Sequence, residues 1–166
     1  MVEKKFVIDG MRLNYDGPFN VIEFYQKVED WIQSKGKEKE IKNKSEHVEP
    51  NGKNIEWFLE IWENVTEYAR SLVRIRVILK DVKDFKPKKK TKKRNLSKGK
   101  VLIIFDGILE TDIEGRWQQK SIYYFIRALA DKFVHKFYMN KIEDKLAADV
   151  NDLYDALTDF FHSYPK

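Results

Sequence analysis

The chain has 166 residues, with 32 lysines and arginines against 27 aspartates and glutamates, and a formal net charge of +5. Its length and a hydrophobic content of 42% suit one domain with a core of its own, and the absence of cysteine excludes disulfides, thiolate zinc sites and thiol nucleophiles. The longest strictly apolar run, residues 101–105, is far too short to span a membrane, and the N-terminus lacks a signal-peptide pattern. We therefore expect a cytoplasmic protein.

The first elements are a strand and a helix. Residues 5–15 alternate between apolar and polar types and predict a strand, and the Asp-Gly-Pro sequence at 16–18 predicts a turn. A helical pattern follows, with Asn20 and Glu23 spaced as in a capping box. Gly36 suits the end of that helix. An amphipathic helix packed on a sheet is the expected result.

The middle of the chain is rich in strand signals. Residues 38–49 are polar with weak alternation and predict an edge strand, and two strong strands follow at 55–65 and 69–82. Pairing these two around a turn near residues 66–67 creates one continuous apolar face. The opposed pairs on that face are Ile55–Leu79, Trp57–Val77, Leu59–Ile75 and Ile61–Val73.

The last third predicts one strand and a long helical segment. The strand runs over residues 100–113, and helical periodicity covers 121–138 and resumes at Ile142. Because the apolar stripe changes phase between these two stretches, we expect a break or bend near Asn140.

The same dipeptide occurs in the first and the last predicted strand. Asp9-Gly10 and Asp106-Gly107 each sit inside a predicted strand, where this dipeptide usually marks a bulge or bend. The alternative, two carboxylates paired in a cleft, needs more assumptions.

These elements predict an α+β fold, with an antiparallel sheet of about five strands packed by an N-terminal helix and a long, bent C-terminal helical segment. In element order, this layout resembles the helix-grip architecture of START-type and polyketide-cyclase-like proteins, in which a curved sheet wraps a long C-terminal helix. The resemblance implies a hydrophobic cavity between sheet and helix, and hence a carrier or enzyme for a small apolar ligand or lipid.

The most informative segment for function is a basic loop at residues 86–100, which contains nine basic residues and no acidic one. Without it the chain would have 32 − 9 = 23 basic residues against 27 acidic ones, so a net charge of −4. We expect the loop to bind the phosphates of an anionic polymer, most plausibly RNA or the ribosome. Its candidate contacts are Lys86, Lys88, Lys89, Lys90, Lys92, Lys93, Arg94, Lys98 and Lys100. An anionic membrane surface, a targeting signal and a merely solvated loop are the alternatives.

A second candidate surface lies on the outer side of the predicted hairpin. There Phe58, Trp62, Arg74 and Arg76 interleave aromatic rings with cations, an arrangement that can stack single-stranded bases beside phosphates. The alternative is that these apolar side chains are covered by a helix or a partner.

The sequence contains no recognisable catalytic or metal-ligating pattern, and we expect no cofactor and, on balance, no enzymatic activity. Asp152, Asp155 and Asp159 share one side of the last helix. Such a stripe is usually a solvent face, but it could meet the basic loop of a second copy in a self-assembling structural subunit.

Overall fold

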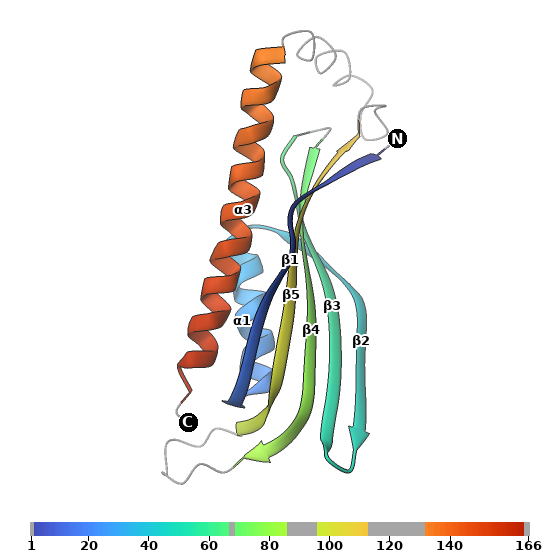
Figure 1. Ribbon diagram of the computed structural model, residues 1–166, viewed down its shortest axis with the longest axis vertical. Helices are drawn as coiled ribbons and strands as arrows, with labels where there is room; N and C mark the ends of the chain where they lie inside the picture. The colour runs from blue at the N-terminus through green and yellow to red at the C-terminus, as the bar shows by residue number, and fades with distance from the viewer. Residues whose placement is uncertain (1, 67–68, 86–95, 113–131, 165–166) are drawn as a thin grey trace.

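The structure is a computed structural model, and it describes residues 2–66, 69–85, 96–112 and 132–164 (Figure 1). The described elements are β1 (Val2–Phe19), α1 (Val21–Ser34), β2 (Glu38–Glu49), β3 (Gly52–Asn64), β4 (Ala69–Phe85), β5 (Leu96–Asp112) and α3 (Lys132–His162). The strands form one antiparallel sheet in the order β1-β5-β4-β3-β2. Both helices lie against the same face of this sheet (Figure 1). The predicted α+β fold, with its five-stranded sheet and two terminal helices, is confirmed.

The register of the central hairpin is the one predicted. β3 and β4 pair Ile55 with Leu79 and Ile61 with Val73, and the residues between them follow in step. The eight apolar side chains of this face are all at most 6% exposed. Alternation with period two therefore decides which face of the hairpin enters the core.

The turn predicted at Asp16–Pro18 is wrong, because β1 continues to Phe19 and pairs these residues with Lys98–Lys100 of β5. Two features allow a strand here. β1 is an edge strand, where the missing N–H of a proline need not leave a ladder bond unmade. Tyr15 also folds back over Gly17, where an added Cβ would lie 2.9 Å from the Tyr15 hydroxyl oxygen, and this hydroxyl donates to the Pro18 carbonyl at 2.7 Å.

Helix α1 begins and ends at the predicted residues. The Asn20 side chain accepts a hydrogen bond from the Glu23 amide at 3.0 Å, which caps the first turn. At the other end Gly36 has a φ of +64°, and the amides of Gly36 and Lys37 donate to carbonyls of the last turn. A left-handed backbone conformation at this position favours glycine.

Helix α3 runs without interruption through Asn140, so the break predicted there is wrong. Among the α3 residues whose burial is described, from Met139 on, the buried stripe consists of Ile142, Leu146, Val150, Leu153, Leu157 and Phe161. The first turns of α3 rise beyond the strands that it packs against (Figure 1), so an apolar stripe need not keep its phase there. The predicted helix at 121–138 lies largely outside the described residues.

The two Asp-Gly pairs have different structural roles. Gly10 has a φ of +73° at a register shift of β1, as predicted for a bulge, and its amide donates to Asp106 Oδ1 at 2.7 Å. Gly107 instead lies under α3, where an added Cβ would be 3.2 Å from Val150 Cγ2. The absence of a side chain at Gly107 lets the helix approach the sheet closely.

The edge strand β2 differs in character from the other strands. Every one of its residues is exposed except the half-exposed Ser45. Its side chains are mainly lysines and glutamates, with Ile41 and Val48 as exposed aliphatic residues, and a bulge interrupts its pairing with β3 between Ile41 and Asn43.

Candidate nucleic-acid interface

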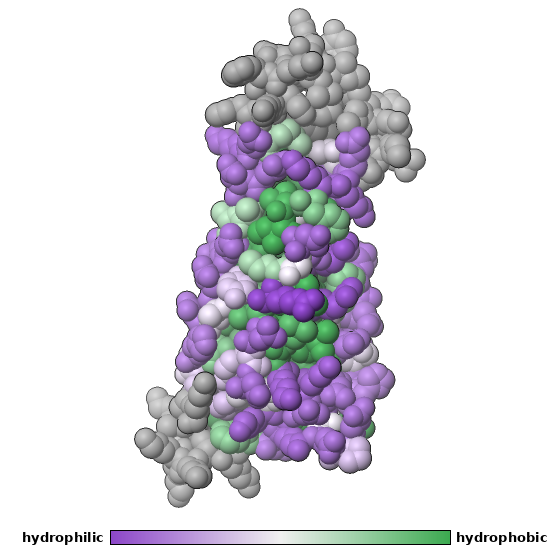
Figure 2. Space-filling model, viewed as in Figure 1, coloured by the Kyte–Doolittle hydropathy of each residue, from purple (hydrophilic) through white to green (hydrophobic). Residues whose placement is uncertain are grey.

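The sheet has an inner face, which packs on α1 and α3, and an outer face, which points away from both helices. Figure 2, drawn from the same side as Figure 1, shows the outer face as hydrophobic patches divided by hydrophilic side chains. At one end of this face Leu72 and Ile108 are buried, whereas Ile78, Leu102 and Ile104 are half-exposed. The accessible part of the outer face therefore lies toward the end of β4 and the start of β5, where the basic segment is attached.

Three successive rows of side chains cross β1, β5 and β4 in this accessible part. Strand register defines the rows as Arg12–Ile104–Arg76, Asn14–Leu102–Ile78 and Asp16–Lys100–Lys80. An apolar row is thus bracketed by arginines on one side and by lysines on the other. We call these nine residues the outer-face rows.

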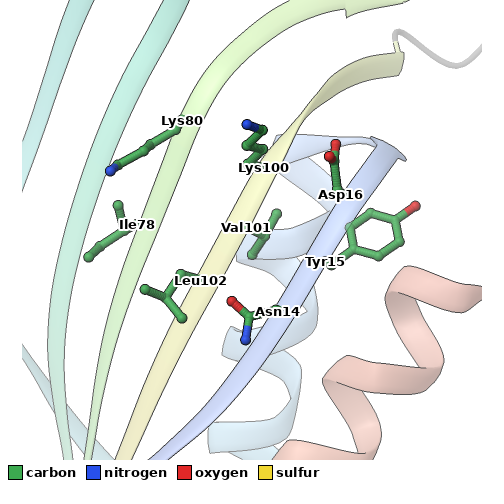
Figure 3. Close-up of a pocket in the computed structure, with 8 residues that line it drawn as sticks. All are labelled: Asn14, Tyr15, Asp16, Ile78, Lys80, Lys100, Val101 and Leu102. Carbon is green, nitrogen blue, oxygen red and sulfur yellow. The ribbon is translucent and has the colours of Figure 1, made fainter.

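A shallow pocket of about 340 Å³ lies over two of these rows (Figure 3). Its lining residues come from the three strands and are Asn14, Tyr15, Asp16, Ile78, Lys80, Lys100, Val101 and Leu102. Figure 3 shows Lys80, Lys100 and Asp16 along one side of the pocket, with Asn14 on the other side near Leu102.

The cations of the outer-face rows lack ionic partners. Within the described part of the chain, the side chains of Arg12, Arg76, Lys80 and Lys100 form neither an ion pair nor a hydrogen bond. Several other surface lysines are paired, as in Lys5–Glu143 at 2.7 Å, Lys53–Glu46 at 3.1 Å and Lys42–Glu40 at 2.9 Å.

Lys80 and Lys100 also occupy directly opposed positions on β4 and β5, with their ammonium groups pointing in different directions (Figure 3). Like charges at opposed positions repel, so this pair is unfavourable in the free protein. An anion bound between the two ammonium groups would relieve that repulsion.

The predicted second surface is brought together in part. The guanidinium carbons of Arg74 and Arg76 lie 5.7 and 5.3 Å from the centre of the Phe58 ring, within cation–π range. Arg74 is 3.5 Å from Glu60, and its buried Nε has no hydrogen-bond partner. Trp62 lies further along β3, where Arg70 is 6.0 Å from its ring. These aromatic rings are half-buried, and the described helices lie on the opposite face.

The basic loop is shorter than predicted, because β5 begins at Leu96. Lys98 and Lys100 consequently lie in a strand, with Lys98 opposite Lys83 and its ammonium 5.8 Å from the Phe85 ring centre. The other predicted contacts lie outside the described residues, and they are Lys86, Lys88, Lys89, Lys90, Lys92, Lys93 and Arg94.

The interior between α3 and the sheet is filled by side chains. Phe105, Leu146, Val150 and Leu157 are all at most 1% exposed and belong to one core cluster. Packing of this kind leaves little room for the cavity that the helix-grip resemblance implies.

A cleft of about 540 Å³ lies instead beside the N-terminus of α1. Its lining mixes apolar side chains such as Ile22 and Ile55 with charged ones such as Lys44 and Glu46. Lys44 Nζ is 4.5 Å from the centre of the Tyr25 ring. Partial burial, and then the charge of Glu46, raise the pKa of the Tyr25 hydroxyl.

The acidic side of α3 is partly used within the molecule. Asp152 accepts from the Trp31 indole at 2.9 Å and lies 3.3 Å from the Lys35 ammonium. The indole hydrogen bond, and then Lys35, lower the pKa of Asp152. This carboxylate therefore ties α1 to α3 and is not freely offered to a second copy. In the described ranges no group of three or more acidic or histidine side chains is arranged to hold a metal ion.

Sequence reasoning did not bring β1 into the candidate site. Arg12, Asn14 and Asp16 join it only through the pairing of β1 with β5, which connects segments more than eighty residues apart. The alternation of residues 5–15 places these polar side chains on one face, but it does not identify the neighbouring strand.

Comparisons with known proteins gave no match to a family model, to a curated protein or to a solved structure. The helix-grip resemblance therefore remains a prediction based on element order. No helix in the described ranges is long and apolar enough to cross a membrane.

Proposed function

We propose that this protein binds a single-stranded nucleic acid, RNA in the first instance, through the outer-face rows and the adjoining basic segment. The observation that carries the proposal is the cluster of unpaired cations Arg12, Arg76, Lys80 and Lys100 on a sheet face that neither described helix covers. A negatively charged polymer is the ligand class that complements such a cluster.

The apolar side chains between the cations favour a single strand over a duplex. Ile78, Leu102 and Ile104 are half-exposed among the charges, and the Phe58 ring lies beside Arg76. A single strand can place the faces of its bases on such side chains while its phosphates meet the cations. In a duplex the base faces are stacked inside the helix, so this apolar surface would stay exposed to water.

The charge of the sequence supports the same ligand class. Residues 86–100 carry nine basic residues and no acidic one, and in the chain they follow β4, which carries Lys80, and extend into β5 as far as Lys100. Lysines contact phosphates as point charges, and so they suit sequence-independent binding. Ribosomal RNA is one natural source of such a ligand, and association with ribosomes is the corresponding form of the proposal.

The test compares two double variants with equal loss of charge. Lys80→Gln/Lys100→Gln removes the opposed pair, whereas Lys27→Gln/Lys141→Gln removes two exposed lysines from the helical side of the molecule. For a single-stranded RNA oligomer, we expect the first variant to bind about tenfold more weakly at 0.1 M salt and to lose about 1.4 from the slope of log K against log salt. The control should stay within about twofold of the unmodified protein.

Equal losses in both variants would show that only net charge matters and would overturn the assignment of this face. Failure of the unmodified protein to bind RNA, polyphosphate or ribosomes at low salt would refute the function itself. If vesicles with anionic headgroups bind more tightly than RNA does, the ligand is a membrane surface.

A carrier of small amphipathic molecules is the second candidate. It is favoured by the cleft of about 540 Å³ beside α1, a volume within the range of small-molecule sites. Here we expect an apolar fluorescent probe to bind with an affinity that Ile22→Ser reduces and Lys80→Gln leaves unchanged. An unaltered signal in Ile22→Ser removes the cleft as its site.

A further inference from the structure

We propose that the shallow pocket on the outer face is a subsite for one nucleobase, and that it prefers bases with an exocyclic amino group. This inference rests on the proposed function. It adds that the surface recognises bases as well as phosphates.

The floor of the pocket is suited to a base and unsuited to a phosphate. Ile78 and Leu102 are opposed on β4 and β5, and both are half-exposed. A phosphate placed over these side chains would lose hydration without gaining a hydrogen-bond donor. The flat face of a base would bury apolar surface against them and gain free energy by doing so.

The arginines and lysines of the outer-face rows lie at the two ends of this floor. Arg76 precedes Ile78 by two residues on β4 and Lys80 follows it by two, so their Cα atoms are about 13 Å apart along the strand. Arg12 and Lys100 bracket the floor in the same way on β1 and β5. A strand of RNA that follows the direction of β4 can therefore hold one phosphate at each end with a base between them.

Polar groups on β1 line the side of the pocket. Asn14 offers an amide that can both donate and accept a hydrogen bond, and Asp16 offers a carboxylate, whose oxygens accept. In the described structure the Asp16 side chain has no hydrogen-bond or ion-pair partner.

A carboxylate repels phosphate, so Asp16 favours the Lys80 side of the lysine row for a phosphate and leaves the β1 side for a base edge. Carboxylates accept from the amino group of cytosine, and asparagine pairs with adenine. Uracil has no exocyclic amino group, and so it should bind here less well.

The experiment measures three ligands: oligo(A), oligo(U) of equal length, and inorganic polyphosphate. The variant Ile78→Ser/Leu102→Ser removes the floor and keeps every charge. The matched control, Ile41→Ser/Val48→Ser, changes two exposed aliphatic residues on the edge strand β2. We expect the floor variant to lose about fivefold to tenfold in affinity for oligo(A) and less than twofold for polyphosphate. The control should lose neither.

Two single variants of exposed residues test base recognition even if the floor variant does not fold. Asp16→Ala and Asn14→Ala should each reduce the preference for oligo(A) over oligo(U), because each removes a hydrogen-bonding group, while the number of phosphate contacts, and with it the salt slope, stays nearly unchanged. The preference should be about threefold or more in the unmodified protein.

Different results separate the failure of this inference from the failure of the function. RNA binding that depends on Lys80 and Lys100 but shows equal affinity for both oligomers overturns the subsite and leaves the function standing. Equal weakening of oligo(A) and polyphosphate in the floor variant also overturns it. Absence of binding to all three ligands refutes the function, and the subsite with it.

Discussion

The two faces of the sheet are built from the same strands, and they differ in what happens to charge. On the inner, helical side the buried cation Lys37, which lies between α1 and β2, is paired, with its ammonium 2.8 Å from Glu63 of β3 and 3.0 Å from Asp149 of α3. On the outer face Arg12, Arg76, Lys80 and Lys100 are unpaired within the described residues. On the inner face the apolar side chains are buried and the charge of Lys37 is neutralised. On the outer face some apolar side chains are partly exposed and these four cations have no ionic partner in the described part of the chain.

Under the proposed function, this difference predicts that stability and ligand binding depend on alternate residues along each strand. Because successive residues point to opposite faces, β5 alternates between the core residues Ile103 and Phe105 and the outer-face residues Leu102 and Ile104. Substitutions at neighbouring positions should therefore affect different properties.

The largest expected effect tests this alternation with one residue type at adjacent positions. Ile103 is fully buried, and Ile103→Ala should lower the free energy of unfolding by about 2–5 kcal/mol. Ile104 is half-exposed, and Ile104→Ala should cost about 1 kcal/mol or less. Chemical denaturation of both variants measures the difference. Equal losses would mean that the outer face is also part of the core.

A second comparison uses lysine on both faces. Lys37→Met leaves Glu63 and Asp149 without their cation and should destabilise the protein by about 2–4 kcal/mol. The two carboxylates are partly exposed, which keeps the loss toward the lower end of that range. Lys80→Met should leave stability almost unchanged. Thermal unfolding distinguishes the two variants, and a stable Lys37→Met protein would contradict a structural role for the pair.

The pH dependence of stability sharpens the view of the inner face. Partial burial alone raises the pKa of Glu63, but the hydrogen bond and charge of Lys37, with a contribution from Lys145, outweigh it and lower the pKa below the usual 4.5. A lowered folded-state pKa gives stability that is present above pH 4.5 and is lost as the pH falls below it. Glu63→Gln should therefore reduce the loss in the free energy of unfolding between pH 6 and pH 3, measured by denaturation at each pH. The same loss in both proteins would exclude Glu63 as its source.

The smallest effect concerns the opposed lysines. If Lys80 and Lys100 repel, Lys100→Gln should raise the free energy of unfolding by about 0.2–1 kcal/mol at low salt. The gain should disappear at 1 M salt, where charges are screened over about 3 Å. The same variant should bind RNA less well, so the gain in stability and the loss of affinity would occur together. A variant less stable at low salt would show that no repulsion exists there.

Local patterns predicted much of the fold. The apolar alternation of residues 55–82 was sufficient for the hairpin register, and the Asn20 cap and Gly36 marked both ends of α1. The predictions failed where a distant segment decides the conformation. Residues 16–18 have the composition of a turn, yet pairing with β5 extends them as a strand. The apolar stripe changes phase before Ile142, and this would require a break only in a helix that packs on the sheet along its whole length. The first turns of α3 rise beyond the strands (Figure 1), so the helix continues.

The candidate site was predictable only in part, for a similar reason. Phe58, Arg74 and Arg76 were placed together because they lie on one hairpin. The contribution of β1 depends on the pairing of the first strand of the chain with the last, β5, which no short-range pattern indicates. The unpaired state of Lys80 and Lys100 is likewise a property of the assembled surface.

The charged edge strand β2 has a consequence for the solution behaviour of the molecule. An open sheet with a free edge invites another chain to extend it, which is a common route to fibrils. The lysines and glutamates of β2 and the bulge after Ile41 make this edge a poor template for such growth. We therefore expect the β2 edge to resist the addition of a strand from a second copy, which leaves the sheet open and its outer face accessible.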